Sequence, residues 1–507
     1  MYSFEKETDN LIITDVSTPV PWKNILTSET HYLEIDQCGQ GKSFILEGKK
    51  RIPLRREKRF IYLRDDENGA VYSPFHVPGF SSIENFRCEH GPGHSSLRGQ
   101  TDKITVSMDT HLPRDKGECI RLGVHNNDSR KRTVSLFIYM PLAWNDARTT
   151  NAFWDDDNGI LLHFSPQTQH RMDTLEENMR KYPNWQAAAA DCKPASWEAS
   201  EYRFMGGSYR ENAPAAVTSG ACSCLPARGV PICAAMHWTF SLEPNESKQV
   251  HLYLDADADR NNATETVKKR ASKEFFDASR RAVDEYWESL RNTYKISTPD
   301  PELDLLCNTW LKKQNLELCR FDRGNDVQIT ARNLMQDLLG WAMIEPDAAW
   351  KKFTAVLEHQ SADGQLPRGW VPDSKIRGGG LNALNFRDGA VWLIFTGSIL
   401  ANWQHETVMD EPYPFDDDSK GTVYDHICRA YESMANDRGE HGLSLLGEGD
   451  WNDALTGPGR NGKGETLMLS STLVYALKLF LPWVRQRRDS KREKEIETII
   501  AELSSAV

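Results

Sequence analysis

The sequence predicts a multidomain β + α fold, with an N-terminal antiparallel β-sandwich, a helical linker and a C-terminal helical domain. A chain of 507 residues is too long for one hydrophobic core of ordinary size, so at least two domains are expected. Short alternating apolar runs separated by turn residues fill the chain up to residue 261, and apolar residues at helical spacing follow. This change of periodicity sets the predicted domain boundary.

Residues 1–261 form the predicted β-sandwich domain. Strand-like runs occur at 59–63, 103–108 and 134–139, with polar loops between them. Alternation of this kind is typical of antiparallel strands that bury one face and expose the other. We therefore expect a large antiparallel sandwich, in which only the loop-rich stretch at 176–228 follows no clear pattern.

Residues 262–297 form the predicted helical linker, because apolar residues such as Phe276 and Leu290 recur there at helical spacing. Residues 298–507 form the predicted helical domain, which begins at the helix-start sequence ThrProAsp at 298–300. Apolar helical segments then alternate with loops rich in glycine and aspartate, and no convincing strand pattern appears.

Three of the predicted helices cover residues 334–344, 387–400 and 466–484. The last of them contains the longest apolar run in the chain, but Lys478 and Pro482 interrupt that run and it is barely long enough to span a bilayer. We therefore expect a buried helix there and no membrane association.

Composition and motifs exclude several classes of function. The formal net charge of -12 argues against binding to nucleic acid or to an anionic membrane, because both are negatively charged. The N-terminal sequence MYSFEKETDN has acidic residues where a secretory signal has basic ones, so a cytoplasmic location is expected. The ten cysteines include no CxxC pair, and the common nucleotide, zinc-peptidase and serine-esterase motifs are missing from the sequence. Neither a metal nor a cofactor is expected.

The densest polar segment of the sequence is GlyGluGlyAspTrpAsnAspAla at 447–454, in which Asp450 and Asp453 flank Trp451. An indole ring can stack on a sugar and lower the local dielectric, which keeps a nearby carboxylic acid protonated close to neutral pH. Alternatively, Asp450 and Asn452 cap a short helix, and Trp451 belongs to the core. The residues alone leave both interpretations open.

A second polar cluster lies at 331–337, at the start of an apolar helix. Arg332 and Asp337 could hydrogen-bond sugar hydroxyls there. Alternatively, Asp337 pairs with Arg332 across the helix terminus, since ion pairs at helix ends are frequent. The residues do not decide between the two interpretations.

Taken in order along the whole chain, these segments resemble glycoside hydrolase family 94, which includes the cellobiose and chitobiose phosphorylases and the phosphorylase-like domain of cyclic β-1,2-glucan synthases. The most specific likeness is AspTrpAsnAsp at 450–453, followed by GlyLysGlyGlu at 462–465. The sandwich segment at 64–74 and the segment ThrProAspProGluLeuAsp at 298–304 are also similar to the family.

The resemblance implies a β-sandwich, a helical linker and an (α/α)6 barrel, usually in a homodimer. It implies an inverting phosphorylase that cleaves β-linked gluco- or N-acetylgluco-disaccharides and oligosaccharides with inorganic phosphate, without a cofactor. It implies that Asp453 is the general acid and that Trp451 contacts the sugar. It also implies that Arg332 and Asp337 grip the non-reducing sugar.

Residues 298–507 are too few for a complete barrel. Twelve helices with their loops need about 350–400 residues, whereas about 210 follow the linker. We therefore expect only about half of the barrel, little phosphorolytic activity from this chain alone, and a downstream polypeptide as a candidate to complete the barrel. An inverting β-glycoside hydrolase and a non-catalytic carbohydrate-binding fragment remain the alternative functions.

Overall fold

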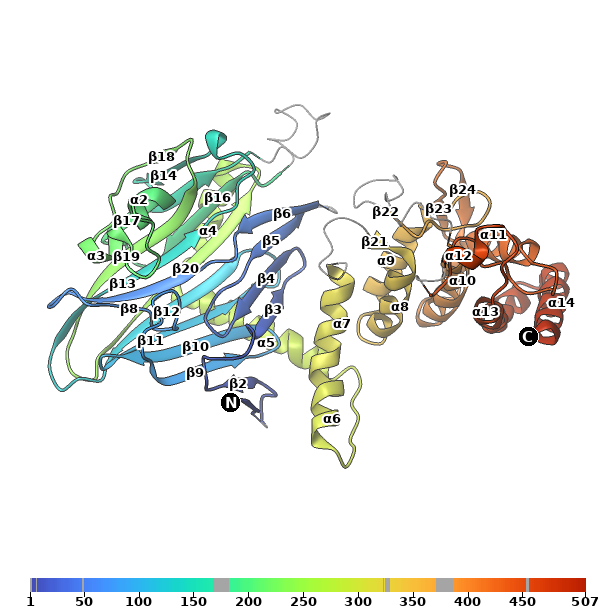
Figure 1. Cartoon of the computed structure of the whole chain (residues 1–507), viewed down its shortest axis with the longest axis horizontal. Coiled ribbons are helices and arrows are strands. Elements are labelled where there is room, and N and C mark those ends of the chain that lie inside the picture. Colours follow the sequence, from blue (N-terminus) through green and yellow to red (C-terminus); the bar gives the residue numbers. More distant parts are fainter. Residues whose placement is uncertain are drawn as a thin grey trace. The chain divides into compact units, whose positions relative to one another are not determined.

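The computed structural model describes most of the chain as two compact units, Met1–Ser289 and Leu290–Val507 (Figure 1). Each unit has its own hydrophobic core. The first unit consists mainly of antiparallel sheets and the second mainly of helices, so the predicted order of a β-sandwich followed by a helical domain is confirmed. The residues described are 2–5, 7–47, 50–166, 182–321, 323, 329–370, 386–452 and 456–507.

The strands of the first unit form two large antiparallel sheets and one smaller sheet. The eleven-stranded sheet has the order β1 (Tyr2–Phe4), β2 (Leu11–Ile13), β9 (Glu84–His90), β10 (His94–Thr101), β11 (Ile104–His111), β12 (Glu118–Asn126), β20 (Ser247–Asp257), β16 (Trp185–Ala190), β15 (Ile160–Phe164), β14 (Asn151–Asp155) and β18 (Ala227–Arg228). The five-stranded sheet has the order β17 (Ser196–Ser200), β19 (Ile232–Leu242), β13 (Arg132–Pro141), β7 (Phe60–Asp65) and β8 (Val71–Tyr72). The four-stranded sheet has the order β3 (Lys23–Thr27), β4 (His31–Asp36), β5 (Ser43–Glu47) and β6 (Lys50–Arg55).

The five-stranded sheet is buried on both faces, which explains why its central strands are apolar almost throughout. Leu136 of β13 belongs to the main core, together with residues of the eleven-stranded sheet such as Leu122. The neighbouring Phe137 faces a second core, which includes Phe204 of α2 (Glu201–Met205) and Val217 of α3 (Ala215–Ser219). These two helices lie in the loop-rich stretch, and they are too short for helical periodicity to reveal them.

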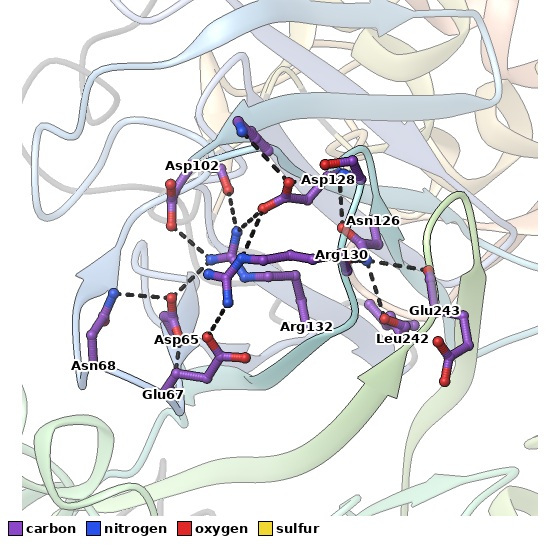
Figure 2. Close-up of polar contacts among 12 residues, drawn as sticks. Asp65, Glu67, Asn68, Asp102, Asn126, Asp128, Arg130, Arg132, Leu242 and Glu243 are labelled. Atoms are coloured by element: carbon purple, nitrogen blue, oxygen red, sulfur yellow. Dashed lines mark hydrogen bonds and ion pairs between the residues drawn. The ribbon is translucent and has the colours of Figure 1, made fainter.

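A buried ion cluster joins the turns of the first unit (Figure 2). Arg132, at the start of β13, is only 2% exposed. Its guanidinium contacts Asp65 at 2.8 Å, Asp102 at 2.7 Å and Asp128 at 3.1 Å. Asp65 ends β7, and Asp102 and Asp128 lie in the connections that follow β10 and β12, so one arginine ties all three segments to the start of β13.

Two helices follow the strands where the sequence predicts a helical linker. They are α4 (Arg260–Arg270) and α5 (Lys273–Arg291), and the side chain of Asp259 caps the N-terminus of α4. Val267 of α4 and Phe276 of α5 pack against β-strand residues in a shared apolar cluster. Both residues are therefore part of the first unit's core.

The second unit consists of helices that pack in two rows. The pairs α8–α10 and α10–α13 are in contact along one row, and α9, α11 and α14 pack against α8, α10 and α13 respectively. Four short strands form two antiparallel pairs, β21 with the distant β22 and β23 with the adjacent β24, that the sequence did not predict, because strands of two or three residues show no alternation. The bounds are α6 (Pro301–Leu305), η2 (Leu306–Trp310), α7 (Leu311–Arg320), β21 (Ile329–Thr330), α8 (Ala331–Ala342), α9 (Pro346–Leu357), β22 (Gly369–Trp370), α10 (Asp388–Leu400), η5 (Ala401–Trp403), η6 (Val408–Asp410), β23 (Pro412–Pro414), β24 (Lys420–Thr422), α11 (Val423–Asn436), α12 (Thr456–Gly459), α13 (Leu467–Gln486) and α14 (Ser490–Ala506).

By length and composition, α13 is the single helix in the described ranges that could cross a membrane. More than half of its most apolar stretch is buried within the protein. Leu473, Leu477 and Phe480 are fully buried and belong to the core of the second unit. This helix therefore supplies core residues, as the sequence predicts.

Candidate active site

The side chain of Asp450 fixes the loop at 447–452 to the start of α13. Asp450 is buried, and its Oδ1 accepts a hydrogen bond from the backbone N–H of Asn452 at 2.9 Å. Its Oδ2 accepts a hydrogen bond of 2.8 Å from the hydroxyl of Thr466, which is the N-cap of α13. Asp450 thus stabilises a turn within the loop and ties it to α13.

Trp451, the next residue of this loop, has 48% of its surface exposed. Its ring lies 5.5 Å from the ring of Trp392 on α10, with the two planes at 40°. This exposure contradicts the alternative in which Trp451 is a core residue. A half-exposed indole offers an apolar face on which a sugar ring can stack.

Arg332 connects α8, α10 and the loop at 447–452. It lies in the first turn of α8, and its Nη1 contacts Asp388 Oδ2 at 2.8 Å and the carbonyl oxygen of Asp450 at 2.9 Å. The guanidinium carbon lies 5.7 Å from the centre of the Trp451 ring, within the range of a cation–π contact. Two of the predicted site residues, Arg332 and Trp451, are therefore brought together although they lie 119 positions apart in the sequence.

Asp388 also belongs to this cluster, although it is not among the site residues predicted from the sequence. It opens α10, and only 4% of its surface is exposed. Burial raises the pKa of Asp388, the nearby Arg332 guanidinium lowers it, and the carboxylate of Asp450 raises it again. The two buried carboxylates of Asp388 and Asp450 therefore lie close enough to repel each other. No local motif could reveal this arrangement, because Arg332 and Asp388 lie 56 positions apart.

Backbone contacts hold the same loop against the start of α10. Phe386 forms isolated bridges with Gly447 and Gly449, and the backbone N–H of Arg387 donates to the carbonyl of Gly449 at 3.1 Å. A Cβ atom on Gly449 would lie 2.6 Å from the Phe386 ring. Glycine is therefore required at 449 for this close approach.

Asp337 forms its ion pair with Arg323. The Arg323 guanidinium donates to Asp337 through two hydrogen bonds, of 2.6 Å and 2.5 Å. Asp337 lies five positions after Arg332, and residues at that spacing do not share a helix face as residues three or four apart do. This geometry explains why Arg332 pairs with Asp388 of another helix.

Asp453, the predicted general acid, lies outside the described residues, so its role stays a prediction. The described loop ends at Asn452, immediately before it. Within the parts of the chain that the structure describes, no group of three or more His, Cys, Asp and Glu side chains could hold a metal ion. The described residues place a half-exposed indole beside a fixed guanidinium, which suits a polar ring such as a sugar.

Comparison with known families accounts for nearly the whole chain. Residues 9–273 match the glycosyl hydrolase 94 supersandwich domain, and residues 286–507 match the catalytic domain of the glycosyl hydrolase 94 superfamily. The first match covers more than half of the chain.

Several characterised proteins are similar over almost the full chain. A 3-O-beta-D-glucopyranosyl-beta-D-glucuronide phosphorylase of Paenibacillus borealis is 30% identical, with 99% of this chain and 65% of the relative aligned. A solabiose phosphorylase of the same organism is 27% identical, with 100% and 66% aligned. The cyclic beta-(1,2)-glucan synthase NdvB of Rhizobium meliloti is 25% identical, with 97% and 18% aligned. The chain thus spans about two thirds of the length of the two phosphorylases.

Proposed function

The chain belongs to glycosyl hydrolase family 94, and from this premise we propose that it acts in an inverting glycoside phosphorylase. The substrate would be a β-linked gluco- or N-acetylgluco-disaccharide or oligosaccharide, and inorganic phosphate would be the co-substrate. The observation that carries this proposal is the half-exposed Trp451, held beside Arg332 at the loop that leads to Asp453.

In the proposed reaction, Asp453 donates its proton to the glycosidic oxygen as the bond from that oxygen to the anomeric carbon breaks. A phosphate oxygen attacks the anomeric carbon from the opposite face, so the product is an α-sugar 1-phosphate and the configuration is inverted. Phosphate arrives as an anion, so no general base is needed. Neither a metal nor a cofactor takes part in this scheme.

The proposed sugar contacts are those that the family resemblance implies, and the exposure of Trp451 beside Arg332 supports them. Trp451 would stack on the sugar ring, and Arg332 would donate hydrogen bonds to its hydroxyls. Asp337 would accept hydrogen bonds from hydroxyls, with its carboxylate oriented by Arg323. The relatives carry the names of phosphorylases that act on different sugars, so the proposal extends only to the class of substrate.

We also propose that further polypeptide covers one face of the second unit and completes a barrel. On α13, Leu467, Met468 and Tyr475 are 42–55% exposed, and the Tyr475 ring lies 5.6 Å from that of Phe395 on α10. Exposed apolar side chains that gather on adjacent helices are typical of a surface that another segment buries. Without that segment, the chain would have little phosphorolytic activity. A cytoplasmic homodimer, with no nucleic-acid or membrane partner, completes the proposal.

The test is the release of sugar 1-phosphate from a panel of β-linked disaccharides, with and without inorganic phosphate. The 507-residue chain is assayed alone and after addition of the C-terminal third of the Paenibacillus borealis glucuronide phosphorylase as a separate polypeptide. We expect phosphate-dependent product with the added segment, and its loss in Asp453→Asn. Release of free sugar without phosphate would instead indicate a hydrolase. Sugar binding without turnover in either mixture, unchanged in Asp453→Asn, would indicate a carbohydrate-binding protein.

A further inference from the structure

The carboxylate of Asp388 forms an ion pair with the guanidinium of Arg332, which also contacts the loop at 447–452. Nη1 of Arg332 carries two hydrogens, and its two described partners are Asp388 Oδ2 at 2.8 Å and the carbonyl of Asp450 at 2.9 Å. One nitrogen thus bridges the first turn of α10 and the backbone of the loop. Moving either partner would redirect the guanidinium plane beside Trp451.

The placement of Arg332 opposes the local electrostatics of its own helix. It is the second residue of α8, where the helix dipole disfavours a cation and favours an anion. Only 16% of its side chain is exposed, so solvent screens the unfavourable interaction poorly. Asp388 supplies the compensating negative charge, and it lies in the first turn of α10, where an anion is favoured.

Three of the loop's described anchors differ in what they reach. The hydroxyl of Thr466 fixes the side chain of Asp450, and the N–H of Arg387 fixes the carbonyl of Gly449. Among these anchors, Arg332 is the one that also contacts the indole of Trp451. Asp388 therefore acts, through Arg332, on the part of the loop that carries the exposed Trp451. The other two anchors hold parts of the loop that pack against the protein.

We propose that Asp388 is a positioning residue, which orients Arg332 and through it the loop at 447–452 that presents Trp451 to the sugar. The assignment of Asp453 and Trp451 to catalysis and binding rests on the proposed function. The orientation of the loop by Asp388 rests on the contacts alone. The two parts can therefore fail separately, and the experiment has to distinguish them.

The first measurement is amide hydrogen exchange in peptides that cover residues 444–466, and it needs no activity. Asp388→Asn keeps the shape of the side chain but removes its charge. We expect the backbone N–H of Asn452, which donates to Asp450, to exchange about tenfold faster in this variant because the loop opens more often. The matched control is Asp347→Asn, because Asp347 is an exposed acid in the first turn of α9. We expect wild-type exchange in the control.

The second measurement is a double-mutant cycle with Arg332→Ala. If Asp388 acts through Arg332, adding Asp388→Asn to Arg332→Ala causes no further increase in loop exchange. A residue that only stabilises the start of α10 would instead add its effect in both backgrounds. Wild-type loop exchange in Asp388→Asn, or additive effects in the cycle, would overturn the proposal. Asp388→Asn is used and not Asp388→Ala, because the isosteric variant still tests the proposal if the loss of the whole side chain prevents folding.

The third measurement is turnover with the added C-terminal segment. We expect kcat to fall about 100-fold in Asp388→Asn with a smaller change in KM. If the loop that precedes the proposed acid is misplaced, the rate of the chemical step falls more than substrate binding does. If wild-type protein makes no sugar phosphate, the proposed function fails while the exchange experiment still tests the positioning role. If wild-type protein is active and the variant is equally active, the positioning role is overturned.

Discussion

Arg132 in the first unit and Arg332 in the second both join segments distant in the sequence, but their surroundings differ. Arg132 is 2% exposed and contacts three carboxylates (Figure 2). Arg332 has 16% of its side chain exposed, and its described polar partners are one carboxylate and one backbone carbonyl. The enclosed Arg132 has a structural role, whereas the partly exposed Arg332 lies beside the half-exposed indole of Trp451. Enclosure rather than charge distinguishes the structural cluster around Arg132 from the candidate site around Arg332.

The largest expected effect is the loss of folding stability in Arg132→Ala. The substitution leaves Asp65 buried without its guanidinium partner, and breaking a buried ion pair in this way costs about 3–5 kcal/mol. Urea unfolding followed by circular dichroism measures this change. Because the two units have separate cores, the transition of the first unit should shift most. A loss below about 1 kcal/mol would contradict the structural role of the cluster.

The pH dependence of stability tests a second buried charge in the first unit. Burial raises the pKa of Asp255 to about 6, and Lys116, whose Nζ lies 3.0 Å away, lowers it only in part. The folded state therefore binds the proton more tightly than the unfolded chain, whose Asp pKa is about 3.9. The stabilising contribution is complete below that value and is lost as the pH rises through about 6.

The measurement is the free energy of unfolding of wild type minus that of Asp255→Asn, from pH 4 to pH 7. A pKa shift of about two units corresponds to about 3 kcal/mol, so the difference should fall by up to that amount across the interval. Taking the difference removes the contributions of the other carboxylates. A difference that rises with pH would show that Lys116 dominates and that the folded-state pKa is lowered.

Long periodic segments were predicted well, because their pattern is local. The predicted strand at 134–139 lies within β13 (Arg132–Pro141), and the predicted helix at 387–400 corresponds to α10 (Asp388–Leu400). The order of the sheet was not predictable. In it, β20 pairs with β12 and with β16, and such long-range pairings leave no trace in local periodicity.

The same distinction applies to the candidate site. The loop around Trp451 stands out in the sequence because its polar residues are contiguous. Its supports do not, because Arg332, Asp388 and Thr466 come from the starts of three different helices. Their contacts depend on how those helices pack, which no pattern within a single segment determines. The ion pair between Arg323 and Asp337 was missed for the same reason.

A smaller effect is expected in Trp451→Ala, at the partly exposed candidate site beside Arg332. Loss of the stacking face should weaken sugar binding by about 1–1.5 kcal/mol, or roughly tenfold in Kd. Folding stability should change little, because half of the side chain is already exposed. Calorimetric titration with a β-disaccharide and a thermal unfolding curve give the two quantities. Unaltered affinity for the sugar together with a large loss of folding stability would show that Trp451 has a structural role instead.

The smallest effect is expected in Arg130→Ala, which separates enclosure from charge within one cluster. Arg130 lies two residues before Arg132, and its guanidinium contacts Glu67 at 2.6 Å and Asp128 at 3.4 Å (Figure 2). Its side chain is 57% exposed, so water already solvates the charge and would solvate Glu67 after the substitution. We expect the urea midpoint of Arg130→Ala to equal that of wild type, in contrast to Arg132→Ala. Equal destabilisation by the two variants would mean that the number of ion pairs, and not their enclosure, determines what each arginine contributes.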